Sequence, residues 1–113
     1  MKKLTAMIIL LTTITSAYAE KTYTPGELNR MISSGRYPEQ GPVIRKETKS
    51  ISFNDCIVAV EGIMSQIRDF YPVETIVNTG LVYMVKAWTN NSATTTTCSK
   101  SDQKMVFTSA LYR

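Results

Sequence analysis

Hydrophobic residues in the middle of the chain recur at the spacing of an α-helix. Between Ser52 and Pro72, apolar side chains return every three or four residues, and the charged and amide side chains fall on the other face. Ser52 followed by Asp55 is typical of a helix N-cap, and Pro72 can end a helix. The apolar positions are Phe53, Cys56, Ile57, Val60, Ile63, Met64, Ile67, Phe70 and Tyr71. This pattern predicts an amphipathic helix over residues 52–71 whose apolar stripe packs on another surface.

After this helix the period changes to two. Four segments rich in β-branched and aromatic residues follow one another, and short runs of turn-forming residues separate them. The segments cover residues 73–78, 81–89, 93–99 and 104–110, with turns at 79–80, 90–91 and 100–103. They predict an antiparallel meander.

The lengths of two turns predict the register of this sheet. A two-residue turn at 90–91 places Tyr83 opposite Cys98, and a four-residue turn at 100–103 places Cys98 opposite Met105. Both turns put Cys98 on the most apolar face of the sheet. The other members of this face are Leu81, Tyr83, Val85, Met105 and Phe107. We expect the long helix to pack here.

The opposite face carries too little charge for a surface that only meets water. Its members include Val82, Met84, Lys86, Trp88 and Val106. Either residues 20–42 of the same chain cover this face, or it binds another molecule. These five residues therefore form the candidate partner surface.

The segment before the long helix is less regular. Thr24, Pro25 and Glu27 have the spacing of a capping box with proline at the first helical position, and Gly35 can end a short helix in the left-handed conformation. Residues 36–42 contain two prolines and a glycine, which predicts an extended loop. Residues 43–51 carry so much charge that we expect either the edge of a sheet or a solvated linker.

The two cysteines lie 42 positions apart, without histidine and without the spacing of a metal or redox motif. We expect a structural disulfide between Cys56 and Cys98, because both residues fall on the faces that meet. Closing a loop of this length is worth about 4 kcal/mol in the chain-entropy account. Together these elements predict an α+β fold in one domain, residues 20–113. A short N-terminal helix precedes one long helix, which packs on a three- to four-stranded antiparallel meander.

The first nineteen residues resemble a bacterial export signal. Lys2 and Lys3 precede an apolar stretch that is too short to span a membrane, and Ala17 and Ala19 have the small-x-small spacing of a cleavage site. We expect cleavage after Ala19 and a soluble periplasmic or secreted product without a stable membrane anchor. Oxidation of the cysteines suits that compartment.

The net charge and the lack of histidine disfavour several classes of function. The whole chain has a net charge of +4 that is spread along the sequence, which disfavours nucleic-acid binding. Without histidine, the chain has no imidazole base and no His-ligated metal, and its serines and acidic residues form no recognised catalytic motif. We therefore expect no enzymatic activity, no catalytic residues, no metal and no cofactor.

Two functions remain open. The first is a non-enzymatic exported protein that binds another envelope or secreted protein, as an accessory, inhibitor or immunity-type factor; a homo-oligomer is compatible with it. The alternative is a small-ligand-binding protein, or a hydrolase, with a pocket between helix and sheet around Met64, Tyr83 and Phe107. A cavity of about 300 Å³ or more would favour the alternative.

Overall fold

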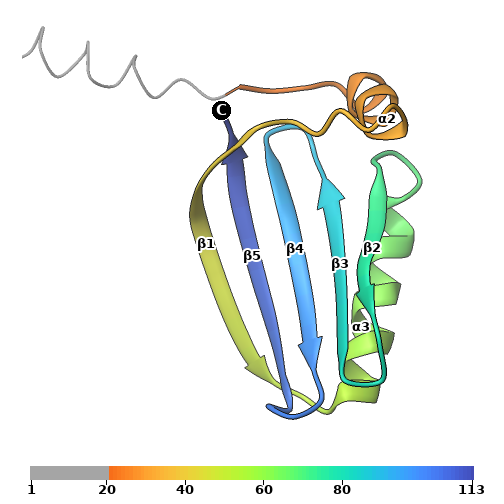
Figure 1. The fold of residues 1–113 in the computed structure, drawn as a ribbon, viewed down its shortest axis with the longest axis vertical. Helices are drawn as coiled ribbons and strands as arrows, with labels where there is room; N and C mark the ends of the chain where they lie inside the picture. Colours follow the sequence, from red (N-terminus) through yellow and green to blue (C-terminus); the bar gives the residue numbers. More distant parts are fainter. Residues whose placement is uncertain (1–20) are drawn as a thin grey trace, which may run out of the picture.

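The computed structural model describes residues 21–113, which form an α+β fold of two helices and one antiparallel sheet. The predicted export signal and its cleavage site lie outside the described residues. The elements are α2 (Pro25–Ser33), β1 (Gln40–Ser50), α3 (Phe53–Ile67), β2 (Val73–Asn78), β3 (Val82–Trp88), β4 (Ser92–Ser99) and β5 (Lys104–Tyr112). The strand order is β1-β5-β4-β3-β2, so β1 and β2 form the two edges of the sheet (Figure 1).

The short helix α2 begins and ends as its sequence predicts. The Thr24 side chain accepts a hydrogen bond from the Glu27 backbone N–H, and the Glu27 carboxylate accepts one from the Thr24 N–H, which completes a capping box. After the helix, Gly35 adopts φ of 75°, a conformation that favours glycine. Leu28 and Ile32 form its buried face.

The long helix α3 is shorter than predicted. The side chain of Ser52 caps its N-terminus, as expected, but the helix ends at Ile67 and not at residue 71. A proline disfavours helical backbone in the residue before it, so the chain leaves the helix and turns ahead of Pro72. Within this turn the backbone N–H groups of Phe70 and Tyr71 both donate to the carbonyl of Ile67. As a result Phe70, predicted to lie on the apolar stripe, is 68% exposed.

The predicted register of the central strands is confirmed. Tyr83 lies opposite Cys98, and Cys98 lies opposite Met105. Helix α3 packs on this face, and the disulfide between Cys56 and Cys98 joins helix to sheet. The core on this side consists of Cys56, Val60, Met64, Tyr83, Val85, Ala87 and Cys98.

Leu81 was expected on the same face, but it lies in the turn before β3 and is 64% exposed. The Thr79 hydroxyl accepts hydrogen bonds from the backbone N–H groups of Leu81 and Val82. This local turn extends one residue further than the predicted turn at 79–80.

The sheet has five strands and not three to four. The additional strand is β1, which pairs antiparallel with β5 despite its charged sequence. An edge strand needs only one partner for its backbone, so β1 forms without an apolar face. Of the alternatives for residues 43–51, the sheet edge is therefore the correct one. Because β1 begins at Gln40, the connection from α2 is shorter than the predicted loop over residues 36–42.

Helix α3 covers only part of its face of the sheet. It packs against β3, β4 and β5, while β1 lies at the far edge of the sheet (Figure 1). Every residue of β1 from Pro42 to Ser50 is exposed. One side of the molecule is therefore a packed helix-on-sheet core, and the other is an uncovered sheet edge.

Candidate functional site

The face of the sheet opposite α3, called the outer face here, holds the five residues of the predicted partner surface. Trp88 is only 2% exposed, because it packs with Leu28 and Ile32 of α2. The ring of Tyr37 lies 5.4 Å from that of Trp88. At Trp88, residues of the same chain cover the outer face, so this side chain is not available as an anchor for another molecule.

The N-terminal segment is held in this position by further contacts. The backbone N–H of Tyr23 donates to the carbonyl of Asn90 at 2.8 Å, and the Tyr23 ring packs edge-on against Tyr112 at 5.2 Å. The Tyr112 hydroxyl donates to the carbonyl of Thr89 at 2.6 Å. Burial raises the pKa of the Tyr112 hydroxyl above its usual value of 10.0, which favours the protonated, hydrogen-bond-donating form.

The other four predicted residues, Val82, Met84, Lys86 and Val106, are half-buried on the outer face. Lys86 already has local partners: its Nζ donates to Gln40 Oε1 at 2.6 Å and lies 5.4 Å from the centre of the Trp88 ring. Burial lowers the pKa of Lys86. The five residues therefore share one face, as the register predicts, but they do not form one open patch.

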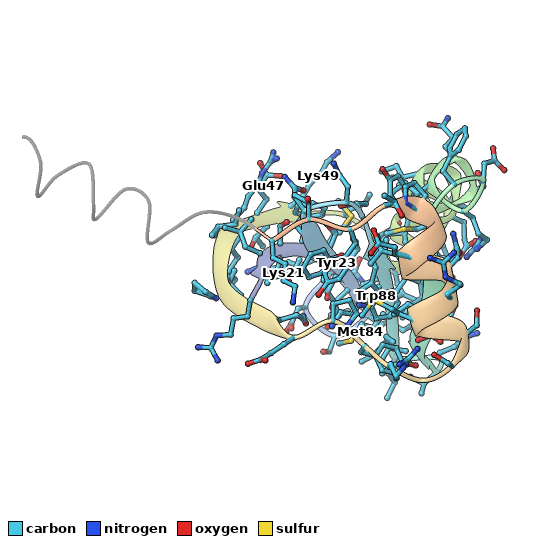
Figure 2. The ribbon with its side chains drawn as sticks, turned by 90° about the horizontal axis from the view of Figure 1, so that it is seen from above. Lys21, Tyr23, Glu47, Lys49, Met84 and Trp88 are labelled. Atoms are coloured by element: carbon cyan, nitrogen blue, oxygen red, sulfur yellow. A yellow bond between two sulfur atoms is a disulfide. The ribbon has the colours of Figure 1, made fainter. Side chains whose placement is uncertain are left out.

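A more accessible site lies on the other face, between α3 and β1. Figure 2 shows Glu47 and Lys49 of β1 on the same side of the sheet as α3, whereas Met84 and Trp88 lie on the other side. Because α3 stops short of β1, an open groove of about 710 Å³ remains between them. We call it the α3–β1 groove. Its lining residues are Arg45, Glu47, Thr48, Lys49, Ile63, Met105 and Phe107.

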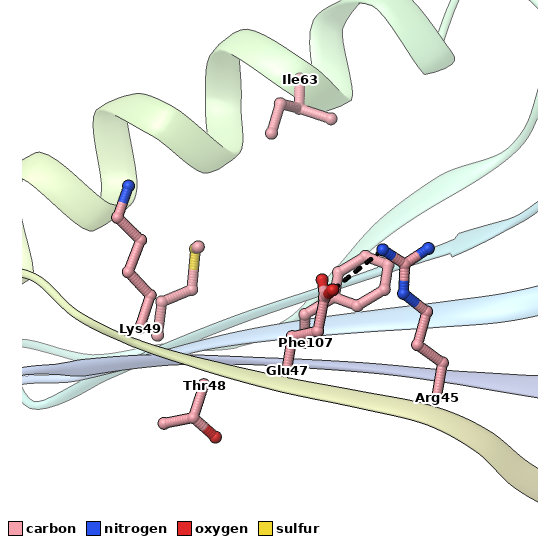
Figure 3. A pocket seen from close by; sticks show the side chains of 7 residues that line it. Arg45, Glu47, Thr48, Lys49, Ile63 and Phe107 are labelled. Carbon is pink, nitrogen blue, oxygen red and sulfur yellow. Dashed lines mark hydrogen bonds and ion pairs between the residues drawn. The ribbon is translucent and has the colours of Figure 1, made fainter.

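The groove has an apolar floor and an apolar wall. Met105 and Phe107 of β5 form the floor and are half-buried. Ile63 of α3 points toward this floor from above and is 55% exposed (Figure 3). When a ligand covers a large aliphatic side chain that is half exposed to water, the free energy of the system falls, which favours binding. The groove therefore offers apolar surface that nothing in residues 21–113 covers.

The second wall is charged and comes from β1. Arg45 and Glu47 form an ion pair at 2.9 Å, and the Arg45 guanidinium lies 5.7 Å from the centre of the Phe107 ring. Thr48 points away from α3 (Figure 3). Lys49 lies on the groove side, opposite Met105, and forms no ion pair with any residue of the described range. The wall combines a neutralised pair with one free positive charge.

The predicted ligand pocket around Met64, Tyr83 and Phe107 is not a single cavity. A space of about 70 Å³ lies beneath α3 and contacts Met64 and Phe107, but not Tyr83. The hydroxyl of Tyr83 instead donates to the Glu61 carboxylate, and burial together with this bond raises the pKa of Tyr83. A drug-sized ligand needs about 300 Å³ or more, so the enclosed space is too small for one.

The sequence contained only part of the signal for the groove. Ile63 belongs to the predicted apolar stripe. The pattern does not show that Ile63 lies on the side of α3 that faces β1, where the helix no longer covers the sheet. In β1, Arg45, Glu47 and Lys49 alternate along the strand, which places them on one face. Such alternation indicates a strand face, but which side of the sheet it occupies depends on pairing with β5.

Two further findings are the search for a membrane-spanning helix and the comparison with known proteins. Among residues 21–113, no helix has the length and apolar character needed to cross a membrane. Comparison with known proteins gives no match: no family model fits the chain, and no curated protein or solved structure is significantly similar to it. The function must therefore be inferred from the chain's own residues.

Proposed function

We propose that this chain is a small, non-enzymatic exported protein that binds another protein of the cell envelope or the secreted fraction through the α3–β1 groove. The uncovered apolar surface of the groove carries the proposal. Ile63 is 55% exposed beside Phe107, while the neighbouring core under α3 is closed. Exposed apolar surface next to polar residues is typical of protein-binding sites.

The structural disulfide supports the export part of the proposal. The bond between Cys56 and Cys98 joins α3 to β4 inside the core, and disulfides of this kind persist in oxidising compartments. Lys2, Lys3 and the small-x-small site ending at Ala19 are consistent with the same destination. We place the mature protein in the periplasm or outside the cell.

The groove suits a protein segment better than a small molecule. A small-molecule site usually surrounds most of its ligand, whereas this groove is open to solvent along β1. Its apolar surface lies beside the charged side chains of Arg45, Glu47 and Lys49. An apolar centre beside a charged rim is the usual composition of a protein interface.

The experiment compares two charge insertions on one helix. Ile63→Glu places a carboxylate in the groove, and Val58→Glu places one on the solvent side of α3, where Val58 is 72% exposed. The oxidised protein and both variants are used to capture partners from envelope extract. Each captured protein is then purified, and its affinity is measured with the wild type and with every variant.

We expect wild type and Val58→Glu to bind one partner in stoichiometric amounts. Ile63→Glu should weaken binding by about thirtyfold or more, since loss of a central apolar contact costs about 2 kcal/mol or more. A third variant, Met84→Glu, tests the outer face. Equal binding by Ile63→Glu and Val58→Glu, or loss of binding only in Met84→Glu, would exclude the groove as the site.

A further inference from the structure

The free edge of β1 indicates how a partner is held at this site. Resting on the proposed function, we propose that the partner adds a β-strand to β1. This strand carries carboxylates beside Lys46 and Lys49 and apolar side chains beside Val43 and Ile44. The groove then receives the residues of the partner that adjoin the added strand.

The backbone of β1 is prepared for a second neighbour. It spans eleven residues and pairs only with β5, so half of its backbone N–H and C=O groups face outward without a strand partner in the described chain. From Arg45 to Ser50 the pairing with β5 is regular, so this part of the edge is straight enough to template another strand. Strand addition to such an edge is a common mode of peptide recognition.

The other edge of the sheet is a poorer template. Strand β2 has only six residues, and its register shifts between Thr75 and Val77. Such an irregularity bends an edge and interrupts its ladder of hydrogen bonds. The register shifts of β1 lie before Arg45, so residues 45–50 keep an uninterrupted ladder, whereas the shift in β2 divides the whole strand.

Charge selects the chemistry of the partner strand. Arg45 and Glu47 neutralise each other at 2.9 Å. Lys46 and Lys49 are exposed and form no ion pair with any described residue. They occupy opposite faces of β1, because Lys46 pairs with Thr108 and Lys49 with Met105. A partner strand with carboxylates on both faces complements them, since opposite charges across neighbouring strands attract.

The same lysines disfavour a second copy of this chain. Edge lysines deter the pairing of like edges, because each copy brings the same positive charges to the interface. A segment rich in Asp and Glu meets no such repulsion. We therefore assign the edge to an acidic partner and not to self-association.

Two exposed apolar side chains in the N-terminal part of β1 favour apolar residues on the partner strand. Val43 is 59% exposed and Ile44 is 57% exposed, next to the irregular pairing between Gln40 and Arg45. Apolar side chains on the added strand would cover these two residues. The segment thus has an apolar half and an acidic half.

The probe is a displayed library of peptides of the same length as β1, selected on the disulfide-bonded protein. We expect the selected peptides to combine acidic residues with β-branched or aromatic ones. The double variant Lys46→Glu with Lys49→Glu should weaken their binding by about tenfold or more, because the charge complementarity is inverted. The double variant Arg36→Glu with Lys100→Glu changes the net charge equally at positions outside β1 and should bind as wild type does.

Hydrogen exchange locates the bound peptide. The outward-facing backbone amides of residues 43–50 should exchange more slowly in the complex, as they do when a strand is added. Unchanged exchange in β1, selected peptides without acidic enrichment, or a concentration-dependent dimer that blocks binding would each overturn the proposal. If Ile63→Glu abolishes partner binding while β1 exchange stays unchanged, strand addition fails and the proposed function stands.

Discussion

Strand β3 packs against α3 on one face and, at its C-terminal end, against α2 on the other, whereas β1 is exposed along most of its length. Both strands belong to one sheet, but they differ in what covers them. Buried apolar area and the disulfide concentrate around β3 and β4, so the stability of the fold resides there. Strand β1 contributes little burial and leaves its edge and groove accessible, which suits binding.

Truncation of Trp88 should cause the largest loss of stability. We expect Trp88→Ala to lower the free energy of unfolding by about 3 kcal/mol or more, since the indole is buried against Leu28 and Ile32. Urea unfolding measures the loss. The control is Trp88→Phe, which keeps an aromatic ring and removes Nε1, a donor without a partner in the described residues. It should cost clearly less; equal costs would mean that packing at this position is not the source of the stability.

Removing the disulfide should have the next largest effect. Replacing Cys56 and Cys98 together by serine should cost about 2 to 4 kcal/mol, by the loss of a cross-link between α3 and β4. Denaturant unfolding with and without reductant checks this. Reductant should weaken the wild type by a similar amount and leave the double variant unchanged. Thiol titration shows whether the reductant has opened the disulfide. If it has, and the stability of the wild type is unchanged, the disulfide does not stabilise the fold.

Charge insertion at exposed positions of α3 should change the free energy of unfolding only slightly. Ile63→Glu and Val58→Glu both change exposed side chains of α3, so each should alter the free energy of unfolding by about 1 kcal/mol or less. Thermal melting of the two variants gives the comparison. A much larger loss in Ile63→Glu would show that Ile63 belongs to the core and that the groove is closed at this position.

The smallest expected effect is a pH dependence at α2. Hydrogen bonds from the Thr24 backbone and side chain lower the pKa of Glu27 below its usual 4.5. A carboxylate with a lowered pKa stabilises the fold above the unfolded-state value and loses this contribution as the pH falls through the folded-state value. Between about pH 5 and pH 3, the wild type should therefore lose slightly more stability than Glu27→Gln. Parallel slopes for the two proteins would show that the capping box contributes nothing in solution.

Local chemistry explains which parts of the fold could be predicted from the sequence. The capping box at Thr24 depends on residues close in the chain, and the position of Cys98 in the sheet follows from the lengths of two turns. Both predictions are confirmed. The packing of α3 on the face that contains Cys98 follows from the same register.

The remaining parts depend on contacts between distant segments. Pairing of β1 with β5 is a backbone interaction across many residues, and the charged sequence of β1 conceals it. The groove arises because a five-stranded sheet is wider than α3 can cover, so the smaller predicted sheet gave no reason to expect it. Trp88 had two alternatives in the sequence, and only the packing of α2 decides between them.

The most direct test of the binding surface is photo-crosslinking from two positions on α3. A photoreactive amino acid replaces Ile63 in one protein and Val58 in another, and both are irradiated with the captured partner. We expect a single crosslinked product of defined mass from position 63 and none from position 58. Equal crosslinking from both positions, or crosslinking from 58 alone, would contradict the assignment of the α3–β1 groove.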